Sequence, residues 1–447
     1  MLIYLLFAVF VFLFVFTYKI FGKEIIAPSV VYVAGYVLCI SGAVCNVKNW
    51  GIDLHWETVG VFIYGALLFV ATGYWVRGRM LSSNAELQTE KSFGELIECN
   101  QKYVTYFIIF QLLIIFGWIG LICYTTSSLG DFDSFSERMI AFRKWSSYST
   151  AWLSSIEFNI FNQLVQISVN SVYLSMYVFV NNLICSKGKV VNKLLLIITI
   201  LSLVQQLLTG GRLGIIGAAL TFVAYCFIFY QKIYNRPYVL SVKQFIALGF
   251  LLAVGAFSFY LSKVIVGRGS DVSWSGFLPH ITTYVGGPVQ LLDMFLQNPG
   301  PASDIWGKET LHGLNFLLAR LGLVDFEPYI VHLEFRTAVT GAFLGNIYTS
   351  YRSYLYDFGY WGLTLCPIIF SSIIHYTYYK ALGSITKFKV NFWIMLYSIA
   401  LLTVFTDFVR CFFFTQFISL SPYKCLLVTY FLSLVFIKQE KVGTHVK

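Results

Sequence analysis

Apolar runs of about 20 residues recur along almost the whole chain of 447 residues. A run of that length crosses the ~30 Å hydrocarbon core of a bilayer as one α-helix, because each residue adds about 1.5 Å. Lipid offers the backbone no hydrogen bonds, so a run inside the membrane must pair its own backbone groups, and an α-helix does this. Hydrophobic residues make up 58% of the chain and charged residues only 12%, which excludes a soluble globular domain. The sequence therefore predicts an all-α polytopic integral membrane protein.

The runs predict about eleven transmembrane helices. Their approximate bounds are 2–18, 26–45, 57–76, 103–123, 160–184, 193–209, 212–231, 243–266, 355–379, 391–409 and 421–437. The first run lacks the basic residues that precede a cleavable signal sequence, so we expect it to remain as a span. Together the runs form a single transmembrane domain, 1–447. Its longer connections are 77–102, 124–159 and 267–354.

The charges in the connections predict an orientation. Alternate connections, which would all lie on one side, contain 18 of the 31 Lys and Arg residues but only six of the 21 Asp and Glu residues. Basic residues accumulate in cytoplasmic connections. We therefore expect the N-terminus and the connections 124–159 and 267–354 outside, with the connection 77–102 and the C-terminus in the cytoplasm.

The connection 267–354 is too long and too apolar to be a simple linker. It contains Trp274, Trp306 and many leucines, and two of its segments, 277–296 and 310–323, have apolar residues at helical spacing. A helix with one apolar face lies on a membrane or dips into it. The sequence predicts a large external loop with amphipathic helices, which the spans hold over a lipid-accessible site.

Arginine is distributed differently from lysine. By the predicted orientation, 15 of the 20 lysines lie inside, whereas eight of the 11 arginines lie outside. The outer arginines are Arg138, Arg143, Arg212, Arg268, Arg320, Arg336, Arg352 and Arg410. A guanidinium is planar and always charged, and it binds two phosphate oxygens at once. The outer arginines therefore suggest an anionic ligand, and pairing with outer acids is the alternative for each of them.

Arg212 lies in a tight turn between two apolar runs, Leu208-Thr209-Gly210-Gly211-Arg212-Leu213-Gly214. Two glycines end the first helix and permit the turn. The amides at the start of the next helix would then face outward beside the guanidinium, and this combination binds anions. The alternative is an arginine that only anchors a hairpin at the membrane boundary.

A second group of polar residues ends the large loop, at 345–359. If this segment is helical, Tyr348, Arg352 and Tyr356 share one face. Such a face combines a phosphate-binding group with rings that stack on sugars. Asp357 lies at the membrane edge, where a carboxylate is costly unless it is paired or functional. The alternative is a structural Arg352–Asp357 ion pair within an aromatic belt.

Two external segments contain possible metal ligands. Asp131 and Asp133 form a D-x-D pattern, which binds metal in enzymes that use nucleotide sugars, and such sugars are not expected outside the cell. Asp53, His55 and Glu57 alternate along the chain, and we interpret them as the polar start of the third span. The nine cysteines are dispersed and lack the spacing of metal or redox motifs. We therefore expect no metal and no cofactor.

Three of these features together resemble the Wzy-type O-antigen polymerases, which polymerise oligosaccharide repeat units. They are the Thr-Gly-Gly-Arg turn at 209–212, the large late external loop, and Asn-Ile-Tyr-Thr at 346–349 followed by Asp-Phe-Gly at 357–359. The likeness in architecture covers nearly the whole chain, and the match in residues is confined to 208–214 and 345–362. Arg212 matches the turn arginine of the family pattern, and Asp357 matches its aspartate. The spaced arginine–glycine repeats of some members are not found in this sequence.

The resemblance implies a membrane glycosyltransferase of GT-C-like architecture. Such an enzyme transfers a growing glycan from undecaprenyl diphosphate to the next lipid-linked repeat unit, on the periplasmic face of the bacterial inner membrane. The lipid diphosphate leaves readily once its charge is neutralised, which outward arginines would do. On this hypothesis the residues that bind the diphosphate are Arg212, Arg268, Arg336 and Arg352.

The acceptor hydroxyl of the incoming sugar needs a proton acceptor. The candidates, in falling order of preference, are Asp357, Glu334, His332 and His312. The residues expected to contact the glycan are Tyr348, Tyr356 and Asn346.

The expected partners are an undecaprenyl-diphosphate-linked oligosaccharide, membrane lipid and a chain-length regulator protein, and no nucleic acid. Two other functions fit the same pathway. A flippase that exports the lipid-linked oligosaccharide would need charged and polar residues inside the spans, whereas the charges here lie mostly in the connections. An O-antigen ligase, which moves a finished glycan to another lipid, is distinguished from a polymerase only by the motif matches.

Overall fold

A computed structural model of the chain describes most of its residues. The described ranges are 1–84, 95–148, 152, 155–190, 192–210, 213–239, 274–383, 390–417 and 419–438. The predicted span at 243–266 lies outside them, as do Arg212 and Arg268 of the expected diphosphate site.

The described part of the chain is mostly α-helical, as the apolar runs predict. Six helices are long and apolar enough to cross a membrane: α1 (Leu2–Ile20), α4 (Trp56–Asn84), α5 (Gln101–Ser127), α7 (Ile156–Cys185), α9 (Leu213–Tyr234) and α13 (Ser350–Gly383). Four shorter apolar helices accompany them: α2 (Pro28–Val44), α8 (Lys193–Leu208), α14 (Phe392–Phe405) and α15 (Ser421–Phe436). The chain is therefore an all-α membrane protein, with six candidate spans by length among its described residues.

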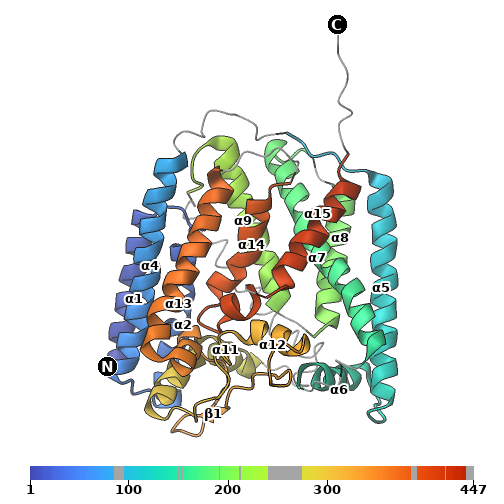
Figure 1. Cartoon of the computed structure of the whole chain (residues 1–447). Helices are drawn as coiled ribbons and strands as arrows, with labels where there is room; N and C mark the ends of the chain where they lie inside the picture. The colour runs from blue at the N-terminus through green and yellow to red at the C-terminus, as the bar shows by residue number, and fades with distance from the viewer. Residues whose placement is uncertain are drawn as a thin grey trace.

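The long helices run side by side, and the smaller elements gather at one end of this bundle (Figure 1). These smaller elements are α6 (Phe135–Tyr148), α11 (Trp274–Gln297), α12 (His312–Arg320) and a hairpin of β1 (Arg336–Thr337) and β2 (Phe343–Gly345). We call this the capped end. The N-terminus lies at the capped end and the C-terminus at the other (Figure 1). The two connections expected outside thus share one end of the bundle with the N-terminus.

Basic side chains cap helices at the opposite end. Lys232 donates to the carbonyl oxygens of Ala381 and Leu382, at 3.1 and 3.0 Å, where α13 ends. Arg77 donates to the carbonyl oxygen of Ile20, the last residue of α1. The last carbonyls of a helix have no partner within the helix and carry partial negative charge, so a cation stabilises them.

Small residues allow the cap to approach the bundle. A Cβ atom on Gly286 of α11 would lie 2.3 Å from the carbonyl carbon of Gly42 in α2 and 2.4 Å from the amide nitrogen of Ala43. The two backbones are therefore in direct contact, as at close helix crossings in membranes. This contact fixes α11 against the C-terminal part of α2 and positions the loop that follows.

Glycine also bends α13. Gly359 has φ 60° and ψ −150° inside this helix, a conformation that favours glycine, so the first turns lean away from the spanning part. These first turns carry Arg352, Ser353, Tyr356 and Asp357. The Asp-Phe-Gly segment thus marks the point where the polar turns join the membrane helix.

Candidate functional site at the capped end

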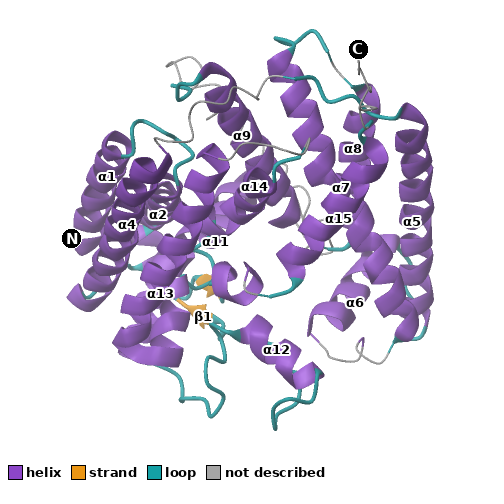
Figure 2. Ribbon diagram, turned by 45° about the horizontal axis from the view of Figure 1, so that its top comes forward, coloured by secondary structure: helices purple, strands orange, loops and turns teal. Residues whose placement is uncertain are grey.

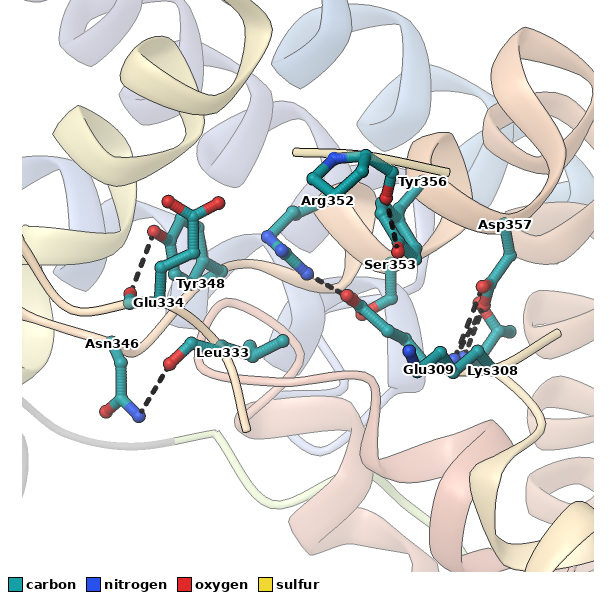
Figure 3. A network of polar contacts seen from close by, with 12 residues as sticks. Lys308, Glu309, Leu333, Glu334, Asn346, Tyr348, Arg352, Ser353, Tyr356 and Asp357 are labelled. Atoms are coloured by element: carbon teal, nitrogen blue, oxygen red, sulfur yellow. Dashed lines mark hydrogen bonds and ion pairs between the residues drawn. The ribbon is translucent and has the colours of Figure 1, made fainter. Parts of the chain in front are cut away.

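The segment 300–310, between α11 and α12, lies on the first turns of α13, and we call it the strap. Asp357 holds it through main-chain contacts, because its carboxylate accepts from the N–H groups of Glu309, at 3.1 Å, and Thr310, at 2.6 Å. The Tyr356 hydroxyl donates to the carbonyl oxygen of Pro301, at 2.8 Å. Figure 3 shows both contacts, with the strap opposite α13.

A buried ion pair joins the strap to the same turns of α13. The Arg352 guanidinium binds the Glu309 carboxylate, which also accepts from the Ser353 hydroxyl at 3.1 Å (Figure 3). The two charged side chains are only 4% and 7% exposed. Three rings surround the guanidinium, with centroids 4.9 Å (Phe295), 4.7 Å (Tyr348) and 5.4 Å (Tyr356) from its central carbon. Burial raises the pKa of Glu309, and the Arg352 charge opposes that effect.

The structure therefore brings together three residues that the sequence placed on one face, Tyr348, Arg352 and Tyr356, although α13 begins only at Ser350. The ion-pair partner differs from the Arg352–Asp357 alternative. Arg352 pairs with Glu309, and Asp357 binds main-chain amides. In this conformation Arg352 already has an anionic partner.

A second ion pair lies in the hairpin. Arg336 binds both carboxylate oxygens of Glu334, at 3.1 and 3.0 Å, and also the carbonyl oxygens of Met294 and Asn298. Hydrogen bonds from this arginine lower the pKa of Glu334. Arg336 thus links the hairpin to the end of α11.

The other residues near the hairpin that the sequence predicted to contact the glycan or to act as a base make local contacts. The Tyr348 hydroxyl donates to the carbonyl oxygen of Glu334, at 3.1 Å, and the Asn346 amide to that of Leu333, at 3.3 Å. His332 is exposed. Figure 3 shows Glu334 and Asn346 apart from the Asp357 contacts, so the sequence candidates form two neighbouring groups.

Arg410 lies beside this network, where α14 has ended and the π-helix η2 (Phe413–Phe417) is about to begin. It is partly buried, and its guanidinium makes no hydrogen bond or ion pair with any residue that the structure describes. A buried charge is costly unless it is paired. The Glu309 carboxylate acts on Arg410 through space but is bound to Arg352, so Arg410 can still bind an external anion.

His312, the first residue of α12, lies close to Arg410. Burial, and to a smaller extent the Arg410 charge, lower the pKa of His312 to about 4, so its ring is neutral at neutral pH. Its Nδ1 atom is buried without a hydrogen-bond partner in the described part of the chain. A Cβ on Gly313 would lie 2.1 Å from the carbonyl oxygen of Thr415, so α12 begins directly against η2. We call Arg410, His312 and the start of α12 the anion corner.

Both views place α12 between the hairpin and α6 (Figures 1 and 2). Trp152, which follows α6 in the chain, contacts α12, because the rings of Trp152 and Phe316 stack with centroids 6.4 Å apart. Phe316 in turn contacts the His312 ring, at 6.0 Å. The connection 124–159 thus contacts, through Trp152, the helix that forms the anion corner.

Sequence reasoning did not single out Arg410 or Glu309. Arg410 was one of eight outer arginines, at the end of an apolar run, and its lack of a partner depends on residues distant in sequence. Glu309 lies 43 residues before Arg352, and no periodicity connects them. The only signal in the sequence was an acid next to the segment predicted to be an amphipathic helix.

The alternating residues before α4 have separate partners. The His55 ring binds Asp293 of α11, at 3.1 Å, and Glu57 accepts from the Tyr360 hydroxyl, at 2.6 Å. Among the described residues, no three His, Cys, Asp or Glu side chains gather as metal ligands do.

No protein-family model, curated protein or solved structure matches the chain. Function is therefore inferred from the chemistry of the capped end and from the resemblance described above.

Proposed function

We propose that this chain is a membrane glycosyltransferase that polymerises undecaprenyl-diphosphate-linked oligosaccharide repeat units into an O-antigen or capsular-type polysaccharide. The anion corner is the feature of the structure that supports this function best. Arg410 is a partly buried cation that forms no ion pair with a described acid. It lies at the capped end, and a neutral histidine is next to it. A lipid diphosphate is an anion that would reach such a position from the bilayer.

In the proposed reaction, a hydroxyl oxygen of the incoming repeat unit attacks the anomeric carbon of the growing glycan. The bond between that carbon and the diphosphate oxygen breaks, and the lipid diphosphate leaves with the electron pair. Arg410 neutralises the charge that develops on the leaving group, which lowers the barrier most when the donor is already in position.

The acceptor proton must go to a base. We favour His312 over Asp357, because the His312 ring is neutral with an unpartnered nitrogen, whereas two main-chain amides occupy the Asp357 carboxylate. Asp357 and Arg352 then act by holding the strap. Tyr348 and Tyr356 contact the glycan in this proposal.

The proposed location is the bacterial inner membrane, with the N-terminus and the capped end in the periplasm and the C-terminus in the cytoplasm. Lysine-rich connections support this orientation. So does the position of the N-terminus beside the cap and away from the C-terminus (Figure 1).

Deletion of the gene tests the function in cells. If the protein is a polymerase, the deletion strain makes surface glycan of one repeat unit per lipid. Complete loss of the glycan would instead indicate a flippase or a ligase and would contradict the proposal.

Complementation of the deletion strain tests the anion corner. We expect Arg410→Ala to reduce polymer by about a hundredfold or more, as when one preorganised stabilising group is removed from a transition state. Arg410→Lys should restore part of the yield, because it returns the charge without the planar fork. The matched control is Arg320→Ala, an exposed arginine at the end of α12, which should leave polymer length unchanged. Full-length glycan from Arg410→Ala at normal protein level would exclude Arg410 from the site.

A further inference from the structure

Asp407 is a buried carboxylate that the proposed reaction does not use. It lies just after α14 ends at Phe405 and is 1% exposed. Its Oδ2 atom accepts from the hydroxyls of Tyr36, at 2.8 Å, and Ser350, at 2.6 Å. Its main-chain oxygen accepts from the N–H of Ser350, at 3.0 Å. Asp407 therefore fixes the first residue of α13 to α2 and to the end of α14.

The other carboxylate oxygen, Oδ1, is buried and has no hydrogen-bond partner within the described ranges. The Tyr32 hydroxyl lies near Asp407 and is hydrogen-bonded with that of Tyr351, at 2.9 Å. No Lys, Arg or His side chain of the described chain forms an ion pair with Asp407. An ionised Asp407 is a buried charge without a cationic partner among these residues, and a bound cation would compensate it.

The helix ends beside Asp407 also suit a small cation. Asp407 follows the C-terminal end of α14, and the end of a helix where the last carbonyls lie carries partial negative charge. The chain then leaves the helix at Thr406 and resumes helical turns only at η2. In membrane proteins, broken helices of this kind coordinate small cations through carbonyl oxygens and helix C-termini.

We propose that Asp407 binds a sodium ion through Oδ1 at the break between α14 and η2. One carboxylate among neutral oxygens supplies a single negative charge, which matches a monovalent ion, whereas calcium is usually held by several carboxylates. The Thr349 hydroxyl is 1% exposed, lacks a partner among the described residues and directly precedes Ser350, so it offers a second, neutral oxygen. The ion would link the start of α13 to the segment between α14 and η2. This inference does not depend on the proposed reaction.

Binding of ²²Na⁺ to the purified full-length protein tests the proposal directly. We expect saturable binding that unlabelled Na⁺ displaces and choline does not. The midpoint of thermal unfolding should rise with Na⁺ when choline chloride keeps the ionic strength constant, because an ion that binds only the folded state stabilises it. Wild-type protein that binds no Na⁺, or whose unfolding responds to pH but not to Na⁺, would overturn the proposal.

Asp407→Asn should weaken Na⁺ binding by about a hundredfold or more, since the only charged ligand is lost. The matched control is Asp293→Asn. Asp293 is also buried, at 3% exposure, but both of its oxygens have partners, in His55 and Thr58. The control should keep the Na⁺ response of the wild type. Equal Na⁺ affinity in Asp407→Asn and wild type would place the ion elsewhere, and the wild-type binding measurement decides the matter if the Asn variant does not fold.

Discussion

Replacing either member of the Arg352–Glu309 pair should release the strap. Both side chains are almost fully buried, at 4% and 7% exposure, so solvent does not screen the pair. Removing one partner leaves the other charge uncompensated, which costs about 3–5 kcal/mol. We therefore expect Glu309→Met and Arg352→Met each to destabilise the contact between strap and α13 by about that amount.

The double variant should cost much less than the sum of the two single variants. Two apolar side chains avoid the desolvation of both charges, and buried pairs replaced in this way are often close to neutral. Residues in direct contact typically couple by about 0.5–3 kcal/mol. Single costs of about 3–5 kcal/mol and a nearly neutral double variant imply a coupling above that range. Such a value fits a buried pair on which Ser353 and three rings also depend.

Trypsin cleavage at Lys308, within the strap, measures this opening locally. When opening and closing are fast, the cleavage rate follows the open population. A loss of 3 kcal/mol therefore means cleavage more than about a hundredfold faster, at about 1.4 kcal/mol per tenfold. The matched control is the Glu334–Arg336 pair, whose carboxylate is 44% exposed, and its disruption should change the rate by less than about tenfold. Additive effects of the two strap variants, or effects no larger than those of the control, would refute this role of the buried pair.

Two further predictions concern pH and packing. The pKa of His312 is lowered to about 4 by burial and by Arg410, so between about pH 6.5 and pH 4 the unfolded chain binds a proton that the folded cap does not. The stability of the folded protein should therefore fall as the pH drops through that window. In His312→Phe the midpoint of thermal unfolding should depend less on pH. An unchanged dependence would contradict the lowered pKa of His312. Gly286→Ala should lower the unfolding midpoint strongly, because the added Cβ would lie 2.3 Å from the carbonyl carbon of Gly42. The control Gly60→Ala, whose Cβ would have no atom within 4 Å, should be neutral or stabilising. Similar midpoints for the two variants would contradict the close helix contact.

The apolar runs predict the helical framework because a membrane restricts what such runs can become. Periodicity also predicts that Tyr348, Arg352 and Tyr356 meet, since all three lie within a few turns of one segment. These relations are local, so the sequence contains them.

Contacts between distant segments were not predictable in the same way. The partner of Arg352 lies 43 residues away in a loop, and Ser350 lies 57 residues from Asp407. No pattern in the sequence specifies which loop covers which helix. For the same reason the unpaired state of Arg410 becomes visible only when its surroundings are known.

The most direct test of the proposed function uses the purified protein in lipid with undecaprenyl-diphosphate-linked repeat units as its only substrate. The expected result is a ladder of longer lipid-linked glycans, with one free undecaprenyl diphosphate released for each repeat unit added, and neither product from Arg410→Ala. Repeat units that cross the bilayer without any increase in length would instead identify a flippase and would contradict the proposed polymerase.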